Sequence, residues 1–294
     1  MMSRACVFAH FDKDDKVDEY VYYYLNELVS IVNKLIFVTV SAISEEDSEK
    51  LKDLGIEVIQ RENIGYDFYS YKIGIERLDL NQYDEVIICN DSVFGPLYSL
   101  KSIFDQMEKK QCDFWGITDS IQLAYHIQSY FLVFNKSIIV STIFSQFWDE
   151  IAILDDKSEI IRRYEVGLSQ LLVSHGYKAE VFSHLVINSH YSSKRLLKRL
   201  LKKPYKIFKF LVTPSRYIKD IFKKSVNSSI KFWDFLLVQN KMPFVKKSLL
   251  TDGEESIDNL KRLKSIFEKK LIDTRYPFYI IENFFERMYH ENEK

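Results

Sequence analysis

The sequence predicts an α/β fold, with helices on both faces of a sheet, followed by a helical appendage at the C-terminus. Over the first 190 residues, short apolar runs alternate with helical segments, as in successive βαβ units. The 294 residues are 47% hydrophobic and 15% aromatic, enough to bury a full core. After residue 190 the chain becomes strongly basic and helical in pattern. We therefore expect two domains, residues 1–190 and residues 191–294.

The first elements are expected to alternate in type. Each strand is a short apolar run, and the second helix is polar on one face and ends at Gly55. Gly65 permits a sharp turn before the third helix. In order, we predict strands over 5–9, 34–40 and 56–60, each followed by one of three helices, over 20–31, 45–54 and 66–78.

The same alternation continues to residue 183. The next strand contains the β-branched run Val86-Ile87-Ile88 and is followed by a Gly95-Pro96 turn. In order, we predict a strand over 85–89, a helix over 100–109, strands over 113–118 and 129–134, helices over 138–151 and 162–175, and a strand over 179–183. Beyond the basic region, helices are expected over 257–270 and 279–289.

The three cysteines and the hydropathy pattern predict a cytosolic protein. Each cysteine lies in or beside an apolar run at unrelated spacings, so neither a disulfide framework nor a zinc site is implied. No apolar run is long enough to span a bilayer, and the N-terminus lacks a signal-peptide pattern. The cysteines are Cys6, Cys89 and Cys112.

Charge is concentrated between residues 190 and 247, where 16 Lys and Arg stand against two acidic residues, although the whole chain has a net charge of -1. Within this region the segment 194–203 places leucines on one helical stripe and cations on the other face. A basic amphipathic helix on an anionic membrane surface is our preferred interpretation. A solvated cationic helix packed on the protein is the alternative, and nucleic acid fits less well because no nucleic-acid-binding motif is present.

The stretch 84–97 carries the clearest functional signal. A buried strand ends at Asn90-Asp91-Ser92, just before a turn. In open α/β sheets ligands bind at the carboxyl ends of the strands, where one Asp can be held against a metal ion or a diphosphate. The placement of Asp91 therefore suggests nucleotide chemistry.

Two other predicted strand ends carry polar residues. His10 and Asp12 follow the first strand, where a base or ribose often docks, although carboxylates there also suit a helix N-terminus. A larger polar group follows the third strand, and we expect it to contact the same ligand, with helix capping by its acidic residue as the alternative. Its members are Asn63, Gly65, Tyr66, Asp67 and Lys72.

The later strands carry candidates for sugar recognition. An aromatic face and nearby hydrogen-bonding side chains suit a sugar ring, which has apolar faces and a polar rim. The alternative for Trp115 is a place in the core. The candidates are Trp115, Gly116, His126, Gln128, Ser129 and Tyr130. Glu165 begins a helix after the sixth strand, where it is either a helix-start carboxylate or a general base facing an acceptor hydroxyl.

Six ordered blocks resemble the rhamnan synthesis protein F family of bacterial polysaccharide glycosyltransferases. The blocks are VFAHFD at 7–12, RENIGYDFYSYK at 61–72, NDSVFGPL at 90–97, DFWGIT at 113–118, HIQSYFLVF at 126–134 and YEVGLSQ at 164–170. Further similarity lies at 227–250 and 275–287, although NSSIKFW at 227–233 departs from the more usual Asn-Pro start of its block.

The resemblance implies a GT-A-like nucleotide-sugar transferase. It implies transfer of L-rhamnose from dTDP-L-rhamnose to a lipid-linked glycan at the inner face of the cytoplasmic membrane, as in rhamnan or O-antigen synthesis. By this resemblance, Asn90-Asp91-Ser92 is the donor-binding motif and Glu165 is the base of an inverting displacement. The polar residues at the other two strand ends are expected to bind the same donor: His10, Asp12, Asn63, Gly65, Tyr66, Asp67 and Lys72.

The sequence offers a single carboxylate for a divalent metal at this strand end. Asn90-Asp91-Ser92 resembles the metal-binding DxD motif of GT-A enzymes, but it has one carboxylate where two would hold Mg²⁺ or Mn²⁺ more firmly. Asp91 is therefore the expected ligand, and Lys72 or a helix N-terminus is an alternative source of charge for the diphosphate. A scaffold without catalytic activity, associated with the membrane and part of a polysaccharide assembly complex, is the second functional hypothesis.

Overall fold

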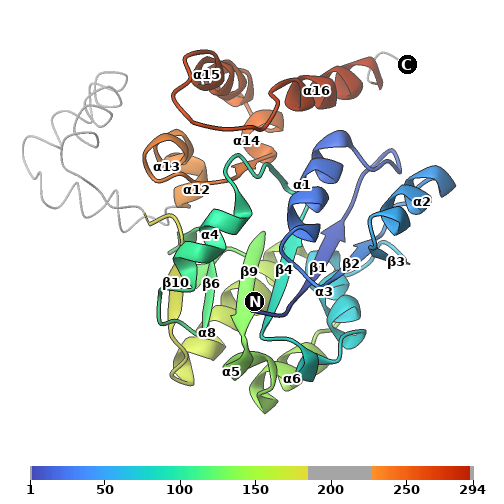
Figure 1. Cartoon of the computed structure of the whole chain (residues 1–294), viewed down its shortest axis with the longest axis vertical. Helices are drawn as coiled ribbons and strands as arrows, with labels where there is room; N and C mark the ends of the chain where they lie inside the picture. The colour runs from blue at the N-terminus through green and yellow to red at the C-terminus, as the bar shows by residue number, and fades with distance from the viewer. Residues whose placement is uncertain (1, 185–226, 292–294) are drawn as a thin grey trace, which may run out of the picture.

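The chain forms an α/β fold in this computed structural model, which describes residues 2–184 and 227–291. A seven-stranded mixed sheet has helices on both faces, and the helices of residues 227–291 lie over one end of the sheet (Figure 1). The strands of this sheet are β1 (Arg4–His10), β2 (Lys34–Thr39), β3 (Glu57–Gln60), β4 (Glu85–Asn90), β6 (Phe114–Gly116), β9 (Phe131–Asn135) and β10 (Ala179–Val181).

The strands lie in the order β10-β6-β9-β4-β1-β2-β3. Six of them run in one direction, and β9 is antiparallel to both of its neighbours, β4 and β6. The sequence pattern predicted βαβ units throughout, that is, parallel strands. The antiparallel β9 departs from this prediction because the hydropathy of a strand does not depend on its direction. As a result, the beginning of β9 and the carboxyl ends of β4 and β6 meet at one edge.

Two small strand pairs flank the main sheet and are too short for periodicity to reveal them. They are β5 (Val93–Phe94) with β11 (Val245–Lys246), and β7 (Asp119–Ser120) with β8 (His126–Ile127). The β5–β11 pair joins the loop after β4 to a segment about 150 residues later in the chain.

The helices predicted within the described residues are present with two changes, and short helices at 157–160, 228–231, 233–239 and 248–251 were not predicted. Ser141 interrupts the helix predicted over 138–151 because its hydroxyl accepts a hydrogen bond from the Phe144 N–H and caps a new helix. The helix predicted over 162–175 begins as a π-helical turn, Ile161–Val166. The helices are α1 (Glu19–Val29), α2 (Glu45–Asp53), α3 (Tyr66–Glu76), α4 (Leu100–Met107), α5 (Lys136–Ile139), α6 (Thr142–Asp149), α7 (Lys157–Ile160), α8 (Gly167–Ser174), α12 (Ser228–Lys231), α13 (Trp233–Gln239), α14 (Ser248–Thr251), α15 (Ser256–Glu268) and α16 (Tyr279–Glu291), with a 3₁₀ turn at Leu80–Gln82.

Each face of the sheet has its own hydrophobic cluster because side chains alternate along a strand. In β1, Phe8 faces the cluster that contains α1 and α4, whereas Val7 faces the cluster that contains α3, α6 and α8. Helix α3 lies so close to β1 that a Cβ on Gly74 would stand 2.3 Å from the Val7 side chain. This contact sets the depth at which α3 sits beside the strand ends.

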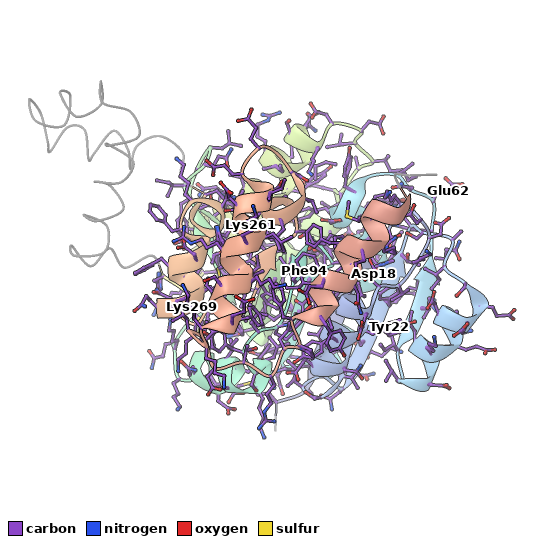
Figure 2. The ribbon with its side chains drawn as sticks, turned by 90° about the horizontal axis from the view of Figure 1, so that it is seen from above. Asp18, Tyr22, Glu62, Phe94, Lys261 and Lys269 are labelled. Carbon is purple, nitrogen blue, oxygen red and sulfur yellow. The ribbon has the colours of Figure 1, made fainter. Side chains whose placement is uncertain are left out.

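Residues 227–291 share the first of these clusters with the N-terminal sheet. Phe244 contacts Tyr24 of α1 at a ring distance of 4.9 Å, and Phe94 lies 5.2 Å from Phe284 of α16. Figure 2 shows these helices from above, with Phe94 beneath them. The helices predicted over 257–270 and 279–289 are present as α15 and α16, and residues 227–291 pack over the strand ends.

The predicted basic amphipathic helix at 194–203 lies outside the described residues. Nowhere in residues 2–184 or 227–291 is there a helix with the length and hydropathy needed to cross a bilayer.

Candidate active site

The carboxyl edge of the sheet brings together most of the predicted site residues. His10 ends β1 and Asn90 ends β4, and these strands are adjacent. Because β9 is antiparallel, the residues before it return to the same edge, and the Asn90 N–H donates to the Tyr130 carbonyl at 3.4 Å. Ser129 and Tyr130 therefore lie beside the Asn90-Asp91-Ser92 motif.

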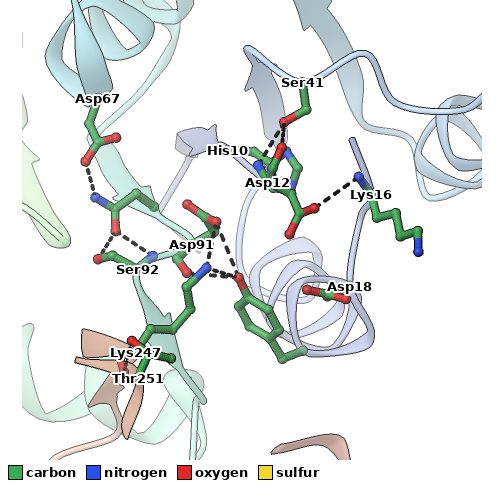
Figure 3. A network of polar contacts seen from close by, with 12 residues as sticks. His10, Asp12, Lys16, Asp18, Ser41, Asp67, Asp91, Ser92, Lys247 and Thr251 are labelled. Atoms are coloured by element: carbon green, nitrogen blue, oxygen red, sulfur yellow. Dashed lines mark hydrogen bonds and ion pairs between the residues drawn. The ribbon is translucent and has the colours of Figure 1, made fainter. Parts of the chain in front are cut away.

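Asp91 is buried in polar surroundings rather than in hydrocarbon. The Tyr20 hydroxyl donates to the Asp91 main-chain oxygen at 3.1 Å and to Oδ2 at 3.3 Å. The Lys247 ammonium lies 3.2 Å from Asp91 Oδ2 and 2.6 Å from the Tyr20 hydroxyl oxygen (Figure 3). Asp91 is thus ionically paired with a cation from the C-terminal region.

Asn90 connects the motif to the start of α3. Its side-chain amide donates to Asp67 Oδ2 at 2.7 Å, and its oxygen accepts from the Ser92 hydroxyl at 2.6 Å. Gly65, at a φ of +71°, forms the N-cap of α3 and places Asp67 in its first turn. These two hydrogen bonds hold the Asn90-Asp91-Ser92 loop in one conformation.

Asp67 is an acidic residue whose pKa is raised by its surroundings. Burial raises its pKa to about 6, and the charges of Asp91 and Glu165 add to the rise, while the hydrogen bond from Asn90 opposes it. Asp67 accepts a hydrogen bond from Asn90, the neighbour of Asp91, and Glu165 accepts one from Ser129 beside the same motif, so the three carboxylates lie in one region. Near neutral pH, a partly buried negative charge is therefore held at this edge.

We expect Asp67→Asn to stabilise the protein at neutral pH. The folded-state pKa of about 6 is above the ordinary value of 3.8, so the folded protein binds this proton more tightly than the unfolded chain. Wild-type stability should therefore fall as the pH rises from about 4 to about 6. The Asn variant keeps an acceptor for Asn90 and avoids this loss, which is on the order of 2 kcal/mol.

Urea unfolding at pH 4.5 and pH 7.5 measures this difference. Asp105→Asn, on the exposed side of α4, serves as the control and should change stability little at either pH. A stability gain of Asp67→Asn that is equal at the two pH values would contradict the buried-charge explanation.

Glu165 lies in the π-helical turn and faces the residues that lead into β9. Its Oε1 accepts from the Ser129 N–H at 3.3 Å and lies 3.6 Å from Nε2 of the buried His126. The other nitrogen of His126, Nδ1, contacts the Ala124 carbonyl at 2.9 Å. These contacts orient a carboxylate whose side chain is 16% exposed, so it can reach a ligand at the strand ends.

Lys246 and Lys247 were not among the residues singled out from the sequence. Lys246 pairs with Val93 in the β5–β11 pair, and the Lys247 N–H donates to the Ser92 carbonyl at 2.9 Å. The Lys246 ammonium stands 5.3 Å from the centre of the Tyr130 ring. Burial lowers the pKa of Lys246, and the charge of Glu165 opposes that change. The basic composition of the region was visible in the sequence, but its contact with Asp91 was not.

Several of the predicted sugar contacts have other roles. Trp115 is buried in the core, 5.0 Å from the Phe104 ring, so the predicted stacking on a sugar is not supported and the core alternative holds. A Cβ on Gly116 would stand 2.3 Å from the Ile127 side chain, so close packing leaves no room for a larger residue at this position. Gln128 and Tyr130 both contact the Thr118 hydroxyl at 2.8 Å.

Three predicted donor contacts at the other strand ends are also engaged within the protein. Both carboxylate oxygens of Asp12 contact Arg287 of α16, the shorter distance being 2.6 Å. The Lys72 ammonium caps the end of α6 through the Trp148 carbonyl at 2.7 Å, so it is not a source of charge for a diphosphate. His10 Nδ1 contacts the Thr39 hydroxyl at 2.9 Å, and burial lowers the pKa of His10.

Asn63 and Tyr66 lie on the exposed side of the β3–α3 connection. The Tyr66 ring is 46% exposed, and its hydroxyl lies 3.5 Å from the Asp155 carbonyl. Neither residue has a buried partner that would prevent contact with a ligand bound at the edge of the sheet.

The described residues do not fit the expected divalent metal. Within residues 2–184 and 227–291, no group of three or more His, Cys, Asp and Glu side chains is placed to hold one. Mg²⁺ prefers several oxygen ligands, whereas Asp91 contacts the Lys247 ammonium and both side-chain polar atoms of Asn90 are already hydrogen-bonded. We therefore derive no chemical step through a metal.

Two curated proteins are similar to this chain. Virulence protein VirA of Vibrio anguillarum is 32% identical over 205 residues, which cover 66% of this chain and 62% of that protein. The uncharacterized protein y4gN of Sinorhizobium fredii is 27% identical over 158 residues, which cover 52% of this chain and 41% of that protein. The chain therefore spans less than two thirds of the length of these relatives.

Solved structures resemble the fold at low sequence identity. The apo-form glycosyltransferase GlyE of Streptococcus pneumoniae has a TM-score of 0.40 and 12% identity, over 70% of this chain and 52% of that one. TarS of S. aureus in complex with UDP-GlcNAc has a TM-score of 0.35 and 10% identity, over 47% of this chain and 46% of that one.

The family comparison covers the greater part of the chain. Residues 35–209 match the family described as Rhamnan synthesis protein F. The matched segment includes Asp67, Asn90, Asp91, His126 and Glu165, which the fold brings to one edge of the sheet. This protein therefore belongs to the Rhamnan synthesis protein F family.

Proposed function

We propose that this protein is a GT-A-like glycosyltransferase that moves a sugar from a nucleotide-sugar donor to a glycan acceptor. The observation that carries the proposal is the grouping of Asp91, Glu165, Lys246 and Lys247 at the carboxyl edge of the sheet. This edge is where open α/β sheets bind ligands. Family membership, which links the chain to rhamnan synthesis, supports the same reading.

The chemistry is a single displacement at the anomeric carbon of the donor sugar. Glu165 takes the proton of the acceptor hydroxyl, and the acceptor oxygen forms the new bond to that carbon. The bond between the carbon and the diphosphate oxygen breaks, and its electron pair leaves with the nucleoside diphosphate. His126 and the Ser129 N–H orient Glu165 for this step. Such a displacement inverts the configuration.

The donor and acceptor extend this proposal through the family. We propose dTDP-L-rhamnose as the donor and a lipid-linked glycan of a cell-surface polysaccharide as the acceptor, met at the inner face of the cytoplasmic membrane. The cationic composition of residues 190–247 supports a membrane location, because each Lys or Arg near an anionic surface contributes about 1 kcal/mol. Asn63 and Tyr66 remain candidates for donor contact.

Calorimetry with nucleotide sugars tests the proposal. Purified protein is titrated with dTDP-L-rhamnose, UDP-glucose and GDP-mannose, and transfer to a lipid-linked acceptor is followed by release of the nucleoside diphosphate. We expect one donor to bind with a micromolar to submillimolar Kd and to be consumed with the acceptor present. A protein that binds none of these donors, nor the free nucleoside diphosphates, would instead be the scaffold of an assembly complex.

A further inference from the structure

Lys246, which ends β11, and Lys247, which follows it, are held against the Asn90-Asp91-Ser92 motif by the backbone. Lys246 is opposite Val93 in the strand pair, and the Lys247 N–H donates to the Ser92 carbonyl. Val245 is fully buried and anchors the same strand in the core. The positions of both lysines relative to Asp91 are therefore set by main-chain hydrogen bonds, not by flexible side chains alone.

The two ammonium groups contact residues at the ends of two neighbouring strands, β4 and β9. Lys247 contacts Asp91, which follows β4, and Lys246 lies over the ring of Tyr130, which precedes β9. The two strands are joined at this point by the hydrogen bond from Asn90 to Tyr130. A ligand at this point would lie near both cations.

Lys246 is partly buried, and no anionic group of the described residues contacts its ammonium directly. Among the described residues, its ammonium makes neither a hydrogen bond nor an ion pair, and its contact is with the Tyr130 ring. Burial lowers its pKa, the charge of Glu165 opposes that change, and the charge of Lys157 lowers the pKa further. A partly buried cation without a direct ionic contact costs folding free energy, so a lysine in this position is better explained by an anion that binds there.

Lys247 can hold Asp91 and a ligand at once. An ammonium group has three N–H donors, of which Asp91 and Tyr20 accept two. The third can be given to a phosphate oxygen. Asp91 then serves to orient Lys247, which explains why a single carboxylate is sufficient in this motif.

We propose that Lys246 and Lys247 bind the diphosphate of the nucleotide sugar and take the place of a divalent cation. This inference rests on the proposed function and names the groups that stabilise its leaving group. As the bond between the anomeric carbon and the diphosphate oxygen breaks, negative charge grows on that oxygen, and the two ammonium groups stabilise it. Binding of the donor therefore does not depend on Mg²⁺ or Mn²⁺.

The test is calorimetric titration of the full chain with dTDP, UDP, GDP and CDP in buffer with EDTA. We expect one of these diphosphates to bind, with a Kd that changes less than about threefold when EDTA is replaced by Mg²⁺. Lys246→Met and Lys247→Met should each weaken its binding by about 10- to 100-fold, as expected for loss of a charge-assisted contact. Lys246→Arg, which keeps the charge, should recover at least part of the affinity.

Thermal unfolding separates a binding role from a structural one. Because the Lys246 ammonium makes no ion pair within residues 2–184 and 227–291, Lys246→Met should keep or raise the Tm while it loses affinity for the diphosphate. Lys261→Met removes the same charge from the exposed side of α15 and should match the wild type in both measurements (Figure 2).

The possible failures are distinct. If the wild-type protein binds none of the four diphosphates with or without Mg²⁺, the proposed function fails and this inference fails with it. If the wild type binds a diphosphate but both Met variants bind it equally well, or if binding requires Mg²⁺, the lysine inference is wrong and the proposed function stands.

Discussion

Replacing Glu165 by Gln is expected to lower the rate of sugar transfer by about 10²- to 10⁴-fold, the usual contribution of a general base. The amide cannot take the proton of the acceptor hydroxyl at neutral pH. Its oxygen can still accept from the Ser129 N–H, which Glu165 binds at 3.3 Å, so the π-helical turn should keep its conformation. Affinity for the donor should change little, because the lysines proposed to bind the diphosphate contact Asp91 and the Tyr130 ring.

The measurement is kcat at saturating donor, together with the Kd of the donor from calorimetry. Glu159→Gln is the matched control because Glu159 lies in α7, one and a half turns earlier, and pairs with the exposed Arg163 at 2.6 Å. That variant should keep wild-type kcat. Turnover of Glu165→Gln within about threefold of the wild type would remove Glu165 as the base and leave donor binding to be judged separately.

Arg287→Met is expected to lower the free energy of unfolding by about 3–5 kcal/mol, the usual effect of removing one partner from a buried ionic group. Arg287 of α16 contacts three carboxylates, at 2.6 Å for Asp12, 2.8 Å for Asp14 and 2.6 Å for Asp18. Without the guanidinium these three negative charges repel one another at the β1–α1 connection. The Tm should fall by roughly 10 °C.

The loss of unfolding free energy in Arg287→Met should depend on pH. Burial raises the pKa of Asp18, and Arg287 opposes that rise, so loss of Arg287 moves the pKa of Asp18 further upward. The variant therefore binds protons more tightly in the folded state and regains stability relative to the wild type as the pH falls. Urea unfolding at pH 7.5 and pH 5 should show a smaller difference from wild type at the lower value.

Lys264→Met is the control for Arg287→Met. Lys264 of α15 pairs with Glu282 of α16 at 2.8 Å, and both side chains are about half exposed. Loss of such a surface pair changes stability by roughly 0–1 kcal/mol. A loss of less than 1 kcal/mol in Arg287→Met would show that the three carboxylates need no cation and that α16 is held by its apolar contacts alone.

The Glu165→Gln and Arg287→Met predictions test different properties, namely the rate of sugar transfer and the packing of the C-terminal helices. Glu165 lies in the segment that matches the family, and its replacement should affect turnover with the fold intact. Arg287 lies outside that segment, and its replacement should loosen the C-terminal helices from the first strand end. If Lys247 is displaced as these helices loosen, diphosphate binding should weaken in Arg287→Met as well.

Local pattern alone was sufficient for the elements of the N-terminal sheet. The apolar run at 86–88 and the polar triplet after it predicted a strand over 85–89, and the structure has β4 end at Asn90. The reason is that burial of neighbouring residues on a strand or helix leaves a period that is visible in a short window. Glu165 was likewise a candidate because it lies after a strand, near the start of a helix.

Composition could not separate a core aromatic from a ligand-binding one. Trp115 and His126 both lay in blocks that suited a sugar site, yet the indole packs on Phe104 in the core while the imidazole reaches Glu165. Both are buried, at 2% and 4% exposure, so their hydropathy environments are alike. Which of them faces the site depends on the strand register and on the reversal of β9.

What the sequence by itself determined is the α/β class, the position of Asp91 at a strand end and the family resemblance, since each depends on residues close together in the chain. The tertiary structure alone decided that Asp91 pairs with Lys247, 156 residues further along the chain, and that Asp12 forms an ion pair with Arg287. These pairings depend on which distant segments pack together, a choice made by the whole core and by chain direction. No local period in the sequence records that choice.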